Sequence, residues 1–164
     1  MKCIDHANRL RAAFIGYSPR VRLDSTDDGE ECAELVIPAS ADGEIEVSVM
    51  LNPQGDGQSV TGDVWLGGED VAKSVPEEEL SDAIRSVLED KVVAVRSYRN
   101  EKRYESKQPF SVRLFLMDSE EDTNEFRRLE EKLHSPATLA EKIFTARRAI
   151  YEISKRSGSE VIRR

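Results

Sequence analysis

The residues best suited to nucleophilic chemistry lie at the start of the chain, where Cys3 and His6 are three positions apart. On a helix, residues at this spacing share a face, and a histidine can activate a neighbouring cysteine as a thiolate. No oxyanion-binding motif accompanies the pair, and the first turn of a helix frays readily. We therefore predict no catalytic residue, and we interpret Cys3 and Cys32 as buried, reduced thiols.

Metal and phosphate chemistry find little support in the sequence. The two histidines, His6 and His134, lie far apart and form no zinc-binding pattern. The acidic segment 24–31 lacks the ligand alternation of a calcium loop. The glycine-rich segment 55–62 has no Walker lysine and joins two predicted strands, so a hairpin turn explains it better than a phosphate loop. We predict neither a metal site nor a cofactor.

Acidic residues are concentrated in one part of the chain. Residues 23–90 contain nineteen acidic and two basic side chains, whereas residues 91–117 contain seven basic and two acidic ones. With so many carboxylates some must lie close together, and proximity alone does not indicate catalysis, which requires a cleft that raises a pKa. An enzyme of unknown type therefore stays open as an alternative.

Basic and aromatic residues are interleaved in the segment 96–113. Basic side chains could neutralise phosphates while aromatic rings stack on bases; the residues that would do so are Arg96, Arg99, Lys102, Arg103 and Arg113. The whole chain, however, has a formal net charge of −8 and a sequence pI ≈ 5.0, where a dedicated nucleic-acid binder is usually basic. Nucleic acid is therefore an alternative rather than the expected partner.

The acidic part of the chain suggests a protein partner instead. Residues 44–51 alternate between polar and apolar, so Glu44 and Glu46 should point to the solvent from a half-buried strand. Asp63 and Trp65 should share a face of the next strand. Trp65 is expected to be a core residue; if it is exposed instead, it is a candidate anchor, because tryptophan is enriched among energetic hot spots of interfaces. We expect a non-catalytic binding module whose acidic sheet face attracts a basic protein through these four residues.

Apolar periodicity and turn residues predict ten elements in the order α-β-β-β-β-α-β-β-α-α. Helices are expected over residues 2–15, 76–90, 119–133 and 135–155, and strands over 21–23, 32–37, 44–51, 59–66, 92–98 and 110–117. Ser74 should cap the second helix through a capping box, and Ser119 should cap the third. Short connections between strands favour an α+β fold with one mostly antiparallel sheet of about six strands and helices on one face.

Three further features complete the expected organisation. Residues 110–117 are apolar on nearly both faces, so this strand should be central and well covered. One domain should span residues 1–156, followed by a frayed tail over 157–164. The last two helices would allow homodimerisation.

The size, acidity and element order are similar to those of secretion chaperones and toxin-immunity proteins. That similarity implies an escort or neutralising role toward one partner, and no sequence motif carries it. The N-terminus has no signal-peptide pattern, and the longest apolar runs are far too short to cross a membrane. With two unpaired cysteines, these features predict a cytoplasmic protein without membrane contact.

Overall fold

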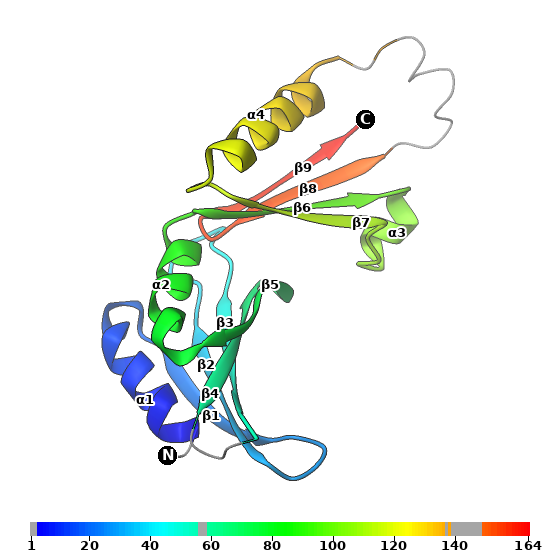
Figure 1. Cartoon of the computed structure of the whole chain (residues 1–164). Helices are drawn as coiled ribbons and strands as arrows, with labels where there is room; N and C mark the ends of the chain where they lie inside the picture. The colour runs from blue at the N-terminus through cyan, green and yellow to red at the C-terminus, as the bar shows by residue number, and fades with distance from the viewer. Residues whose placement is uncertain (1–2, 56–58, 137, 139–148) are drawn as a thin grey trace.

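The computed structural model describes residues 3–55, 59–136, 138 and 149–164. Its strands form two antiparallel sheets, which lie one above the other in Figure 1. The first sheet has the sequential order β1 (Arg20–Ser25), β2 (Glu31–Ile37), β3 (Val47–Pro53), β4 (Val60–Leu66) and β5 (Glu69–Pro76). The second sheet has the order β7 (Ser111–Leu116), β6 (Val92–Tyr98), β8 (Ile150–Lys155) and β9 (Gly158–Arg163).

Two helices cover one face of the first sheet, α1 (Cys3–Ala13) and α2 (Glu77–Leu88) (Figure 1). The strand alternation explains which face this is, because Val47, Val49 and Leu51 are fully buried between the sheet and these helices. A short 3₁₀ helix, Ile15–Tyr17, follows α1. Gly62 lets α2 approach β4, since a Cβ atom there would lie 2.5 Å from Leu80 Cδ2.

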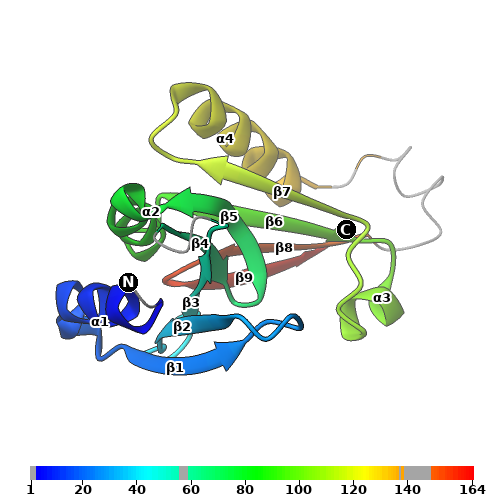
Figure 2. The ribbon, with the colours of Figure 1, turned by 60° about the horizontal axis from the view of Figure 1, so that its bottom comes forward.

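The second sheet carries α4 (Glu120–His134) on the face turned away from the first sheet (Figures 1 and 2). Val93, Val95 and Phe115 form a separate buried cluster under this helix. Val92, on the opposite face of β6, belongs to the core of the first sheet. The second sheet therefore contacts the core of the first at the beginning of β6. A short helix, α3 (Glu101–Glu105), lies between β6 and β7.

The predicted α+β class and antiparallel pairing are confirmed, but the arrangement as a single six-stranded sheet is wrong. The segment after Gly68 adds β5 to the first sheet before α2 begins. Ser74 does not cap α2: it has a φ of 49° within β5, and its N–H donates to Asp63 Oδ1 at 2.7 Å. Ser119 does cap α4, because its hydroxyl accepts from the N–H of Asp122 at 3.3 Å.

The end of the chain differs most from expectation. Residues 150–155, predicted as the end of a helix, form β8, and the predicted frayed tail forms β9. Residues 139–148, which make up much of that predicted helix, fall outside the described part of the chain. The C-terminal strands form because β8 pairs with β6 along five residues, and this long-range pairing outweighs local helical periodicity.

The strand predicted to be central is an edge strand. Among the described strands β7 pairs only with β6, and all of its residues except Phe115 are exposed rather than covered. The central position belongs to β6, which lies between β7 and β8. An apolar run signals burial on both faces only when other elements cover it, and among the described residues α4 covers one face of β7.

Where the structure is described, no helix combines the length and apolarity needed to span a membrane.

Candidate functional site

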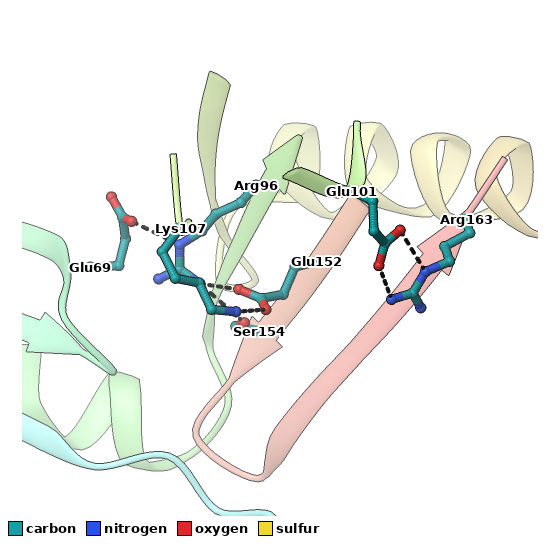
Figure 3. Close-up of polar contacts among 7 residues, drawn as sticks. All are labelled: Glu69, Arg96, Glu101, Lys107, Glu152, Ser154 and Arg163. Atoms are coloured by element: carbon teal, nitrogen blue, oxygen red, sulfur yellow. Dashed lines mark hydrogen bonds and ion pairs between the residues drawn. The ribbon is translucent and has the colours of Figure 1, made fainter. Parts of the chain in front are cut away.

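Arg96 of β6 lies at the junction of the two sheets. Its Nε donates to Glu69 Oε2 of β5 at 2.9 Å, and its Nη1 donates to Glu152 Oε1 of β8, also at 2.9 Å (Figure 3). Nη1 also contacts the hydroxyl of Ser154 at 3.3 Å. The Arg96 side chain is 12% exposed, so this pairing takes place largely away from bulk water. A partly desolvated arginine needs such carboxylates, because an unpaired buried charge is costly.

The hairpin between β4 and β5 positions Glu69. Gly67 and Gly68 have φ values of 56° and 84°, the left-handed conformation that suits a tight two-residue turn. The turn is anchored by the N–H of Gly67, which donates to the carbonyl of Glu46 at 2.9 Å. Glu69 follows this turn directly, and its carboxylate contacts Arg96 of the second sheet.

These side chains line a cleft of about 410 Å³. Lys107 enters from the β6–β7 connection, where its Nζ lies 3.6 Å from Glu152 Oε2. Tyr98 is almost fully buried, and burial is the main cause that raises the pKa of its hydroxyl, followed by the charge of Glu152. The cleft thus contains two cations and two carboxylates that compensate each other. Its described lining includes no cysteine or histidine, and its two serines are Ser154 and Ser159.

Arg156 forms a second connection between the sheets. Its side chain is 5% exposed, and its Nη2 donates to the carbonyl of Pro38 at 2.8 Å and lies 3.2 Å from Glu44 Oε2. Its Nη1 donates to the carbonyl of Ile45. The N–H and hydroxyl of Ser40, followed by the N–H of Ala41 and the charge of Arg156, lower the pKa of Glu44. Glu44 is therefore engaged within the fold rather than presented as a free charge.

The other three predicted partner-binding residues lie on or beside the face of the first sheet that no described helix covers, called the helix-free face below. Glu46 is exposed just before β3, and Asp63 and Trp65 are half-buried on the face of β4 opposite the helices. Asp63 also accepts hydrogen bonds from Asn52 Nδ2 of β3 and from the N–H of Ser74 in β5, so it links β4 to both neighbouring strands. Trp65 is not a core residue.

The predicted nucleic-acid residues do not share one face. Arg96 faces the cleft, whereas Arg113 is paired in register with Val95 on the α4 side and contacts Glu125 at 3.0 Å. Arg99 is exposed and lies 4.1 Å from the centroid of the Phe110 ring. The two remaining basic residues, on α3, are exposed: Lys102 and Arg103.

Cys3 and His6 do share a helix face, and both are buried. Desolvation raises the pKa of the Cys3 thiol, followed by the charges of Cys32 and Glu31. A nucleophilic thiolate needs the opposite shift. His6 Nδ1 instead lies 2.5 Å from Glu77 Oε1, which also accepts from Arg9 at 2.6 Å, and this cluster attaches α1 to the start of α2.

Comparison with protein-family models, with curated proteins and with solved structures found no match to this chain. Within the described residues, no group of three or more histidine, cysteine or acidic side chains is arranged to hold a metal ion.

Arg96 was predicted only as a possible nucleic-acid contact, and its carboxylate partners were not predicted. Glu69 and Glu152 lie 27 and 56 positions from Arg96, and neither belongs to a recognisable motif. Arg156 gave no signal either, since it lies in a segment predicted to follow a helix. The one usable sign was the Gly67-Gly68 pair, which is typical of a tight hairpin turn and could have indicated β5.

Proposed function

We propose that the chain is a non-catalytic protein-binding module of the adaptor, chaperone or immunity type, which binds a basic protein partner through the helix-free face of its first sheet. The observation that carries the proposal is the position of Trp65. It lies between Ser48 of β3 and Asp70 of β5, on a sheet face that no described helix covers, and it is half-buried rather than part of the core. A tryptophan held in this way offers a rigid apolar surface at low entropic cost.

Nearby carboxylates determine the kind of partner that this face suits. Asp63 precedes Trp65 by two residues on the same strand face, and Asp70 is its cross-strand neighbour. A lysine or arginine of a partner could contact the indole ring and a carboxylate together. Two cations partly neutralise the carboxylates of this sheet, since Lys73 contacts Asp70 at 3.0 Å and Arg22 lies 3.8 Å from Glu34. The proposed site therefore centres on Trp65 and not on net charge alone.

The proposal includes a cytoplasmic location. Both cysteines of the chain, Cys3 and Cys32, are free and buried thiols, as is usual in a reducing compartment.

A pull-down from native lysate at low and high salt tests the proposal. The variants are Trp65→Ala and Glu46→Lys, with Glu78→Lys on the exposed side of α2 as a charge-matched control. We expect one stoichiometric protein partner that high salt releases, that both test variants lose and that the control retains. Equal retention by all three variants, or recovery of nuclease-sensitive material alone, would exclude this face as the binding site.

Intrinsic fluorescence gives an independent measurement because Trp65 is the only tryptophan of the chain. Addition of the captured partner should shift or quench its emission if the indole is buried in the complex. A tight complex that leaves the emission unchanged would contradict a central role of Trp65.

The Arg96 cleft favours a second candidate, a small-ligand site. Its cations, Arg96 and Lys107, and its carboxylates, Glu69 and Glu152, converge on a volume of about 410 Å³, which suits a small zwitterion such as a free amino acid. Thermal-shift screening of free amino acids tests this candidate, with Lys107→Ala as the comparison. A ligand that stabilises the original protein more than the variant supports it; equal or absent stabilisation rejects it.

A further inference from the structure

β7 combines an exposed apolar face with an open edge. Val112, Leu114 and Leu116 are 37%, 38% and 51% exposed, and Phe110 just before them is 65% exposed. Their cross-strand neighbours Arg96, Ala94 and Val92 show that this row lies on the face opposite α4. A contiguous apolar row on an edge strand is unusual, because such strands readily pair with other chains.

The backbone groups of Val112, Leu114 and Leu116 point toward the open edge, whereas the N–H of Phe110 donates to the carbonyl of Ser97 on β6 at 2.7 Å. Met117 N–H donates toward β6, to the carbonyl of Lys91 at 2.7 Å. Backbone groups of alternate residues point to opposite sides of a strand, so those of Val112, Leu114 and Leu116 point away from β6. The N–H of Leu116 is indeed bonded on that side, to Asp122 Oδ2 at 2.8 Å. In the described part of the chain, β7 pairs with no strand at this edge.

Charges of opposite sign lie at the two ends of β7. Near its start, Arg99 stacks on Phe110, and Lys107 is 64% exposed. Beyond its end, Asp118 is 68% exposed, and α4 begins with three acidic residues, Glu120, Glu121 and Asp122. A second copy of β7 in antiparallel orientation would bring its basic end beside the acidic end of the first. A parallel copy would place like charges together.

We propose that β7 is the dimerisation edge of this protein, where it pairs antiparallel with β7 of a second copy to form one continuous eight-stranded sheet. A two-fold axis through Leu114 places Leu114 opposite its own copy and Val112 opposite Leu116. A shift that centres the axis on Arg113 would oppose two like charges, which disfavours it. Both backbone groups of Leu116 change partners in this dimer: its N–H leaves Asp122 Oδ2, and its carbonyl leaves the N–H of Ser119, which donates to it at 2.9 Å in the single chain. This interface is separate from the Trp65 face, and neither depends on the other.

Analytical ultracentrifugation of the whole chain tests the proposal. Leu114→Lys places two ammonium groups opposite each other at the axis and should raise the dimer dissociation constant about tenfold or more. The matched control is Leu23→Lys on β1, the edge strand of the other sheet, where Leu23 is 60% exposed. We expect the control to remain dimeric. Equal effects of the two substitutions would show that self-association is nonspecific hydrophobic association and would overturn the proposal.

Charge reversal tests the orientation of the two copies. Asp118→Arg alone should weaken the dimer. Asp118→Arg combined with Arg99→Glu should restore it, because residue 118 of one copy then again lies beside a residue 99 of opposite charge in the other.

A Leu114→Cys variant should form an intermolecular disulfide under mild oxidation, since paired antiparallel residues lie within disulfide range. A monomer at all concentrations up to about 1 mM would overturn the proposal. So would a monomer that uses Leu114 to bind a different protein.

Discussion

Arg96 and Glu69 join the two sheets through a hydrogen-bonded ion pair, with 2.9 Å between Nε and Oε2. Glu69 comes from the acidic part of the chain and Arg96 from the basic part, so the uneven charge distribution of the sequence is partly used within the fold. Arg156 and Glu44 repeat this relationship at a second point, 3.2 Å apart. Acidic and basic segments therefore meet at the junction of the sheets, and less of the acidity faces the solvent than the segment charges suggest.

Removing the Arg96 side chain should destabilise the fold. Arg96→Ala leaves Glu69 and Glu152, which are 23% and 13% exposed, without their shared cation. We expect a loss of about 2–4 kcal/mol in the free energy of unfolding, measured by urea denaturation. The control is Arg113→Ala, whose pair with Glu125 is about half exposed and should contribute ~1 kcal/mol or less. Equal losses in the two variants would show that the junction does not depend on Arg96.

Glu44 should make the protein sensitive to acid. Its folded-state pKa is lowered below 4.5, mainly by the N–H and hydroxyl of Ser40. The resulting stabilisation is present above the unfolded-state pKa and is lost as the pH falls through the folded-state value. Stability measured from neutral pH down through 4.5 should therefore fall less in Glu44→Gln than in the original protein. Parallel curves for the two proteins would contradict the assignment.

His134 should give the opposite pH dependence. Its pKa is raised above 6.5, first by the hydrogen bond to Glu160, where Nε2 lies 2.7 Å from Oε1. This contact between α4 and β9 stabilises the fold fully below the unfolded-state pKa and loses its effect as the pH rises through the folded-state value. NMR titration should place the His134 midpoint above 6.5, and Glu160→Gln should lower it. An unchanged midpoint in the variant would rule out this partner.

Gly62 should not tolerate a side chain. A Cβ atom there would lie 2.5 Å from Leu80 Cδ2 and 3.2 Å from Val49 Cγ1, so Gly62→Ala must displace the buried Leu80 side chain or move α2 away from the sheet. We expect a loss of about 1–3 kcal/mol, seen as a lower midpoint of thermal or urea unfolding. Gly16→Ala is the control, because nothing lies within 4 Å of a Cβ atom at that position. A destabilisation of the same size in the control would point to backbone conformation rather than to packing.

Local pattern predicted most elements of the chain up to residue 134. The helices α1, α2 and α4 and the strands β2, β3, β4 and β6 lie close to where periodicity placed them. The Ser119 cap was confirmed because capping is a local interaction between residues three positions apart. The Ser74 cap was wrong because an additional strand, β5, uses that residue in the sheet.

The sequence by itself determined the antiparallel α+β character, the concentration of acidic residues and the alternation that turns Asp63 and Trp65 to one strand face. Only the tertiary structure decided which strands lie at edges, which residues cross the junction of the sheets, and that the C-terminal segment forms strands. The physical reason is the range of the interactions. Periodicity and capping act within a few residues, whereas the pairing of β8 with β6 and the contact of Arg96 with Glu152 join residues that are more than fifty positions apart.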